Sequence, residues 1–289
     1  MGRFQRSLAL AKESFAVLRS NPQLAWFPVI SSFVTVILTI SFAIPLFLAS
    51  GGFDGLQKAD RFPPGYYAVL AVFYLLSYFI VIFFNVGLVS CAHASLSGSK
   101  MNVSDGLAAA GRRLPAILGW TLVAATVGLI LQMISERSGI FGKIVVAIVG
   151  GAWNLVTYFV VPIIAIEQGS PIAAIKKSGS MLKRTWGENL IGQGGIGLVL
   201  LLFALIPVVP FVFACISQSP AAILIVLAVS VIYWLALAAV GSSLSGIYRT
   251  ALYLYAETGT VPVVFDSEAL QGAFRQGKPS VVNRWMRRG

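Results

Sequence analysis

The chain has 289 residues, of which 57% are hydrophobic and only 11% are charged, and its formal net charge at pH 7 is +11. Soluble domains carry roughly 25% charged residues. This composition therefore excludes an ordinary water-soluble globule and indicates a protein whose solvent is mostly lipid.

Six apolar runs are long enough to cross the hydrocarbon core of a bilayer, which takes about 20 helical residues. The predicted spans are Leu24–Ala49, Tyr66–Ser90, Ile117–Ile134, Ile144–Ile166, Ile191–Ile216 and Ala221–Val240. None of them contains Asp, Glu, Lys or Arg. The sequence thus predicts an all-α, polytopic transmembrane helical bundle, forming a single integral membrane domain over residues 1–289.

The Lys and Arg residues are distributed unequally between the two ends of these spans. Seventeen of the 21 lie in the N-terminal segment, the loops after spans two and four, and the tail; Lys58, Arg61, Arg137 and Lys143 lie on the other side. Because Lys- and Arg-rich loops stay in the cytoplasm, we expect a multi-pass protein of the cell (plasma or inner) membrane with cytoplasmic N- and C-termini. The positive charge then faces anionic lipid rather than nucleic acid.

Similar segments follow spans two, four and six. Residues 165–170 (AIEQGS) match 255–260 (YAETGT), and 94–99 (ASLSGS) is a weaker copy. Since each such unit begins and ends in the cytoplasm, we expect three parallel hairpin repeats. The repeat units are about 1–98, 99–169 and 170–259, and a cytoplasmic tail covers 260–289.

A short segment with helical periodicity precedes each hairpin. Its apolar residues recur at spacings of three and four: Phe4, Leu8, Ala11, Phe15 and Leu18; Val103, Leu107, Ala110 or Gly111, and Leu114; Ile172, Ile175, Leu182 and Trp186. Such spacing predicts amphipathic helices lying in the cytoplasmic interface with their apolar face toward lipid. Positively charged loops without helices are the alternative.

The basic residues of the second and third segments form what we call the collar. It is expected to contact lipid headgroups through Lys176, Lys177, Lys183, Arg184, Arg112 and Arg113. Each such residue near an anionic surface contributes on the order of 1 kcal/mol of attraction.

Two glutamates occupy equivalent positions in the repeats, where spans four and six leave the inner face. Glu167 and Glu257 each lie two residues before a glycine. A carboxylate is unfavourable at a helix C-terminus, whose dipole end is negative. We therefore expect each to pair with a Lys or Arg of a neighbouring interfacial helix, which would clamp one hairpin to the next. The alternative is a solvated carboxylate that contributes little.

A few polar side chains remain within the spans. Asn85, Asn154 and Tyr158 either bind neighbouring helices or line a polar cleft for a neutral solute or lipid headgroup. Pro162, Pro207 and Pro210 are expected to kink their helices near such a cleft.

The sequence contains only weak matches to motifs for cofactor binding, metal binding or catalysis. Gly192–Gly197 (GQGGIG) matches the dinucleotide fingerprint but lacks the preceding strand, so close helix packing explains it better. His93 is the only histidine and has no partner at a metal-ligand spacing. We expect no enzyme, catalytic residue, metal or cofactor.

One stretch carries a resemblance to known proteins. Glu167–Pro171, Ala174–Ser178 and Leu182–Arg184 resemble a pattern in a loose group of bacterial six-span membrane proteins. The group includes uncharacterised families of unknown function, and the membrane region attached to some glycerophosphodiester phosphodiesterases. The resemblance implies a helical membrane fold and carries over no catalytic residue, because no catalytic domain is expected after Val240.

Two functions remain open at this point. The first is a non-enzymatic, lipid-interacting scaffold that works through its basic collar. The alternative is a transporter or channel for a neutral or lipid-like substrate. Membrane lipids with anionic headgroups are the expected partners, and an unidentified membrane-protein partner or a homo-oligomer stays open.

Overall fold

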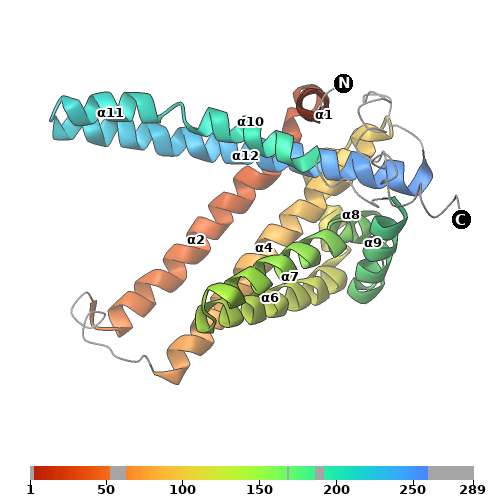
Figure 1. Cartoon of the computed structure of the whole chain (residues 1–289), viewed down its shortest axis with the longest axis horizontal. Coiled ribbons are helices and arrows are strands. Elements are labelled where there is room, and N and C mark those ends of the chain that lie inside the picture. Colours follow the sequence, from red (N-terminus) through yellow and green to blue (C-terminus); the bar gives the residue numbers. More distant parts are fainter. Residues whose placement is uncertain (1–2, 53–62, 168, 186–191, 260–289) are drawn as a thin grey trace, which may run out of the picture.

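The computed structural model describes residues 3–52, 63–167, 169–185 and 192–259, which contain helices and short connections and no strand (Figure 1). The elements are α1 (Arg3–Ser20), η1 (Pro22–Ala25), α2 (Trp26–Ala49), α4 (Pro64–Leu96), α5 (Val103–Gly111), α6 (Leu114–Arg137), α7 (Ile140–Val156), α8 (Val160–Glu167), α9 (Pro171–Thr185), α10 (Gly192–Ala204), α11 (Val208–Ile216) and α12 (Pro220–Thr258).

Six helical segments are apolar and long enough to cross a membrane, in agreement with the six predicted spans. They are Pro22–Ala49, Gly65–Leu96, Leu114–Arg137, Ile140–Glu167, Val199–Ile216 and Pro220–Thr258. The fold is therefore that of a multi-pass membrane protein.

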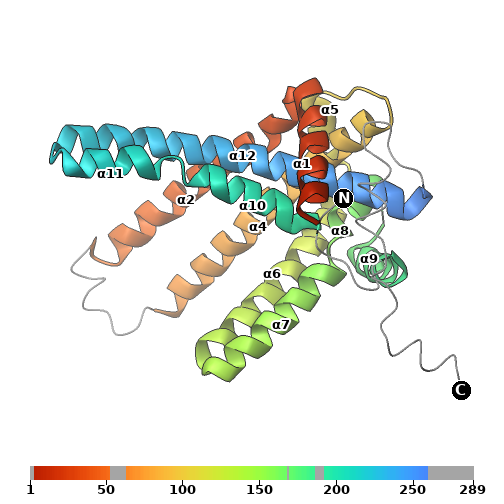
Figure 2. The ribbon, with the colours of Figure 1, turned by 45° about the horizontal axis from the view of Figure 1, so that its top comes forward.

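Consecutive long helices pack against each other: α2 with α4, α6 with α7, and both α10 and α11 with α12. Figures 1 and 2 show these three pairs extending in different directions from one region, where α1, α5, α8 and α9 gather. We call this region, together with the adjoining ends of α2, α4 and α12, the hub. The equivalence of the three units as repeats stays a prediction.

The buried core lies in the hub rather than along the spans. Phe27, Phe159, Tyr248 and Tyr253 are among its largest fully buried side chains. In contrast, only 0% to 22% of the most apolar window of each span is buried. Most of the apolar surface of the spans is thus left for lipid.

The last span is much longer than the predicted segment that ended at Val240. Helix α12 continues to Thr258 and has 39 residues, which makes it about 58 Å long at roughly 1.5 Å per residue. A hydrocarbon core is only about 30 Å thick. The C-terminal part of α12, from Gly241 to Tyr253, is therefore a hub helix, in which most residues are buried.

Spans four and five are each broken into two helices, as their prolines predicted. The first break separates α7 from α8 at residues 157–159, and the second separates α10 from α11 at residues 205–207. A proline ring crowds the carbonyl four residues earlier, which places both breaks just before Pro162 and Pro210. The second break is bridged from α12: the Tyr233 hydroxyl donates to the Phe203 carbonyl at 2.8 Å and the Trp234 indole N–H to the Ala204 carbonyl at 3.0 Å.

Short helices form at all three predicted places, α1, α5 and α9, and their buried faces carry small residues as well as large ones. On α9 the fully buried residues are Ala174 and Ser178, whereas Ile172 is 63% exposed. On α1, Ser14, Val17 and Leu18 are buried, whereas Phe15 is 50% exposed. The small side chains let these helices pack closely against their neighbours in the hub, which the pattern of large apolar residues did not reveal.

A close crossing of α4 and α5 illustrates this packing. A Cβ added at Gly106 would lie 2.5 Å from Cys91 Sγ, 2.5 Å from Phe27 Cζ and 3.0 Å from the Gly87 carbonyl oxygen. Gly87 faces the same phenyl ring, with its own Cβ position 2.7 Å from Phe27 Cε1. The two glycines therefore allow α4, α5 and the start of α2 to meet around one buried ring.

Candidate functional site

A three-residue charge cluster joins three helices at the surface of the hub. Lys177 of α9 places its Nζ 2.8 Å from Glu167 Oε1 at the end of α8 and 2.8 Å from Glu257 Oε1 near the end of α12. Both ion pairs expected of the glutamates are thus present, and one lysine makes them both. We call Lys177, Glu167 and Glu257 the bridge. Its role in holding the helices together stays a proposal.

Local contacts hold the bridge in place. Ser170 precedes α9 and its hydroxyl accepts a hydrogen bond from the Ala173 N–H at 3.3 Å, as an N-cap does. One turn after Ala174, the buried Ser178 hydroxyl accepts from the Phe159 N–H at 3.1 Å, at the break before α8. The Tyr253 hydroxyl donates to Glu167 Oε1 from α12. Helices α8, α9 and α12 are thereby tied together beside Lys177.

The environment of Lys177 favours its charged form. Burial opposes the charge, but hydrogen bonds from the ammonium to Glu167 and Glu257, and the charges of both carboxylates, together raise the pKa of Lys177 above its ordinary value. A raised lysine pKa contributes stability at every pH below the unfolded value of about 10.4. This contribution is lost only as the pH rises through the pKa of Lys177 in the folded protein, which is higher still. The contribution is therefore complete at neutral pH.

The predicted headgroup contacts fall into different environments. Lys176, Lys183 and Arg112 are exposed. Arg113 donates from Nη1 to the Ala109 carbonyl at 2.9 Å, and burial, followed by repulsion from Arg112, lowers its pKa. Lys177 belongs to the bridge. The side chain of Arg184 lies outside the described residues.

The three residues of the predicted cleft do not line the groove that the structure describes. Asn85 donates from Nδ2 to the Val81 carbonyl of its own helix at 3.0 Å. Asn154 is exposed on α7. Tyr158 is buried at the α7–α8 break, with Arg249 Cζ 5.1 Å from its ring centre, a cation–π distance. A polar cleft formed by these three residues stays a prediction.

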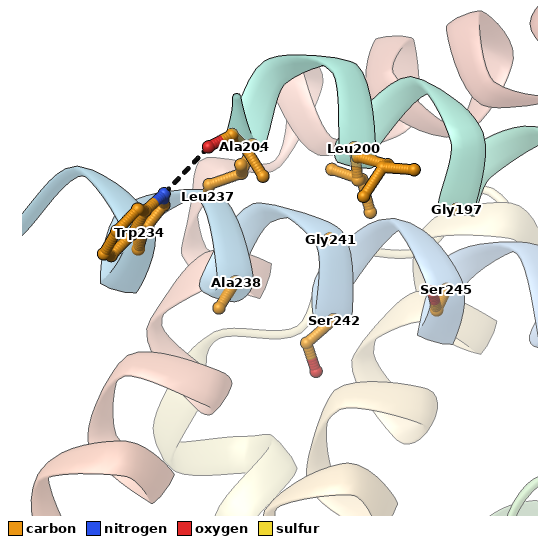
Figure 3. Close-up of a pocket in the computed structure, with 10 residues that line it drawn as sticks. Gly197, Leu200, Ala204, Trp234, Leu237, Ala238, Gly241, Ser242 and Ser245 are labelled. Atoms are coloured by element: carbon orange, nitrogen blue, oxygen red, sulfur yellow. Dashed lines mark hydrogen bonds between the residues drawn. The ribbon is translucent and has the colours of Figure 1, made fainter. Parts of the chain in front are cut away.

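The described groove lies between α10 and α12 and has a volume of about 480 Å³. Figure 3 shows Leu200 above Gly241, while Ala238 and Ser242 point away from α10. A Cβ at Gly241 would lie 2.6 Å from Leu200 Cδ1, so glycine is what lets the two helices approach. The remaining lining residues are Gly197, Leu201, Ala204, Trp234, Leu237 and Ser245. Sequence reasoning identified the glycines of α10 as packing residues but did not find this groove.

Metal-ligating side chains do not gather in the part of the chain that the structure describes: no three His, Cys, Asp or Glu residues there are close enough to hold one ion.

Comparison with known proteins identifies a family and no activity. No curated protein matches the chain. The model of a family described as "Family of unknown function (DUF6159)" matches residues 65–263. The match begins in α4 and runs past the end of α12, so it includes five of the six spans, the groove and the whole bridge. Since it covers more than half of the sequence, the chain belongs to this family of unknown function, DUF6159.

Proposed function

We propose that this protein is a non-enzymatic, lipid-interacting membrane scaffold whose basic collar binds anionic headgroups at the cytoplasmic face. The supporting observation is the orientation of α9. Its Ala174 and Ser178 are buried against the hub, whereas Lys176 and Lys183 are exposed. A helix fixed by one face and carrying exposed lysines on another suits contact with a negatively charged surface.

Several finer features belong to the same proposal. The protein resides in the cell membrane with both termini in the cytoplasm, as the excess of Lys and Arg in the terminal segments and in the loops after spans two and four supports. Its units are three parallel repeats, each introduced by an interfacial helix. We also propose that the residue pattern around α9 is related to the membrane region attached to some glycerophosphodiester phosphodiesterases.

A transporter of a lipid-like substrate is the second candidate. It is favoured by the groove between α10 and α12, since eight of its ten lining residues are Gly, Ala, Leu or Trp and none is charged. An apolar groove suits an acyl chain better than a neutral polar solute.

The collar is tested by removing the exposed lysines of α9. The Lys176→Gln/Lys183→Gln variant should retain less phosphatidylglycerol relative to phosphatidylcholine when purified from mixed vesicles, by about fivefold per lysine. Lys177→Gln is the matched control: its charge already faces two carboxylates, so lipid retention should change less. Mass spectrometry of the co-purified lipids measures the ratio. An unchanged lipid ratio in the double variant would show that the collar does not bind anionic lipid and only sets the orientation of the protein in the membrane.

Orientation is tested with reporter fusions on both sides of the membrane. A reporter fused after Gly289 or inserted at Gly98 should report the cytoplasm, because both sites lie in segments outside the spans that carry several Lys and Arg residues. Insertions near Asp60 or Ser138 should report the outside. Reversal at any two of these sites would contradict both the orientation and the repeat arrangement.

A further inference from the structure

Helix α9 has two opposite faces with different surroundings. Lys176 and Lys183 are exposed, whereas Ser178 is fully buried. Lys177 belongs to the bridge. An α-helix turns by about 100° per residue, so Lys183 lies within about 20° of Lys176 around the helix, while Ser178 lies about 200° away. One face of α9 therefore presents two positive charges, and the opposite face is fixed to the hub.

The buried face of α9 supports the break in span four. The Phe159 N–H donates to Ser178 Oγ at 3.1 Å, and Phe159 is 0% exposed. The amides on either side of it, of Tyr158 and Val160, bond at 3.1 Å to carbonyls three residues earlier in their own segment. The N–H of Phe159 is instead held by α9, which packs against both α7 and α8 (Figure 1). A backbone hydrogen bond at the break thus depends on a neighbouring helix.

We propose that α9 couples the binding of anionic lipid to the α7–α8 break in span four. Phospholipid phosphates at Lys176 and Lys183 stabilise α9 in its docked position, and docked α9 keeps the Phe159 N–H bonded to Ser178. This inference rests on the proposed lipid-interacting function and adds the element of the fold that responds to the lipid.

Docking arranges the two lysines for a lipid surface. They are seven residues apart, which puts them about 10.5 Å apart along one line of the helix. Helix α9 has 15 residues, a length at which an isolated helix is only marginally stable in water. Detached α9 would therefore lose this arrangement of Lys176 and Lys183. Because a ligand shifts an equilibrium toward the state that it binds better, anionic lipid favours the docked state.

The opposite response, in which lipid pulls α9 off the hub and into the interface, is disfavoured by the buried face itself. That face carries the hydroxyl of Ser178, and hydrocarbon offers it no hydrogen-bond partner. Detachment would also break both ion pairs of Lys177. The large apolar Ile172 is already 63% exposed in the docked state, so detachment would add little apolar surface there.

The test measures hydrogen exchange of the full chain in phosphatidylcholine vesicles with and without phosphatidylglycerol. Mass spectrometry with fragmentation resolves the Phe159 amide, whose exchange requires α9 to move away. Phosphatidylglycerol should slow exchange at Phe159 and over residues 171–185, by up to about fivefold for each lysine. Lys176→Gln/Lys183→Gln should abolish this slowing at both places.

A matched pair of serine substitutions separates docking of α9 from its effect on the break. Ser178→Ala removes the acceptor and should speed exchange at Phe159 about tenfold in both kinds of vesicle. Phosphatidylglycerol should then still slow exchange over residues 171–185 but no longer at Phe159. Ser180 is exposed and its hydroxyl donates to the Lys177 carbonyl of its own helix at 2.8 Å, so Ser180→Ala should behave like the wild type. If Ser178→Ala does not fold, the lysine variant still decides, because its changes lie on the exposed face.

Three results would overturn the inference: equal exchange at Phe159 in both kinds of vesicle, faster exchange with phosphatidylglycerol, or slowing that persists in Lys176→Gln/Lys183→Gln. If the lysine variant retains less phosphatidylglycerol but wild-type exchange at Phe159 does not respond to this lipid, the coupling is wrong and the proposed function stands. If retention of the lipid is also unchanged in that variant, both are wrong.

Discussion

Gly106→Ala is expected to lower the thermal midpoint of the purified protein markedly, since overpacking of a tight contact costs about 1–3 kcal/mol. The new methyl would lie 2.5 Å from both Cys91 Sγ and Phe27 Cζ. Phe27 is only 1% exposed, so its ring cannot move aside without disturbing the hub. Loss of tryptophan fluorescence or of the monodisperse elution peak on heating measures the midpoint.

Gly111→Ala is the control for this substitution. Gly111 is in the same helix, α5, and a Cβ there meets nothing within 4 Å. Because alanine favours a helix over glycine by up to about 1 kcal/mol, this variant should keep or slightly raise the midpoint. Equal midpoints for the two variants would show that α4 and α5 do not meet as closely as described.

Lys177→Met is expected to weaken the attachment of α9 to the ends of α8 and α12. The substitution removes two ion pairs and leaves the Glu167 and Glu257 carboxylates facing each other. The side chains of Lys177, Glu167 and Glu257 are 32%, 28% and 38% exposed, so solvent screens the pairs and their combined loss is about 0.5–2 kcal/mol. A decrease in thermal midpoint and faster hydrogen exchange in residues 171–185 would measure it.

The neighbouring Lys176→Met provides the comparison, because Lys176 is exposed and carries the same charge. It should leave the midpoint nearly unchanged while lowering retention of anionic lipid. Adding Glu257→Gln to Lys177→Met should restore part of the lost stability, since it removes the repulsion between the carboxylates. If Lys176→Met and Lys177→Met had the same effect on the midpoint, the bridge would have no structural role.

The spans could be predicted from the sequence because lipid selects strongly for uninterrupted apolar runs. Pro162 and Pro210 also indicated where spans four and five break, since a proline conflicts with the carbonyl four residues before it. The continuation of α12 past Val240 was not predicted, because this part of the helix is not an uninterrupted apolar run. Residues such as Ser243 and Gly246 are not apolar by type, yet both are buried because small side chains suit a close helix crossing.

The bridge was only partly predictable. Glu167 and Glu257 could be identified because they occupy equivalent positions in the predicted repeats. Each lies near a helix C-terminus, whose dipole end is negative, so a basic partner was expected for each. A single residue, Lys177, pairs with both glutamates. This depends on how α8, α9 and α12 converge, which no local sequence pattern encodes. The groove was not predictable either, because its residues come from two helices whose register is set by the contact of Leu200 with Gly241.

The length of α12 has a mechanical consequence. One continuous helix of 39 residues runs from Pro220 to Thr258, where Glu257 meets Lys177. A rigid rod of about 58 Å that pivots at one end moves its other end by about 1 Å for each degree of tilt. Transmembrane helices change tilt with bilayer thickness, and since the hub holds α12 from Gly241 to Tyr253, such a tilt would move mainly the Pro220 end. Glu257 lies beside the held part of the helix, so the charge cluster would keep its geometry while the far end of α12 follows the thickness of the bilayer.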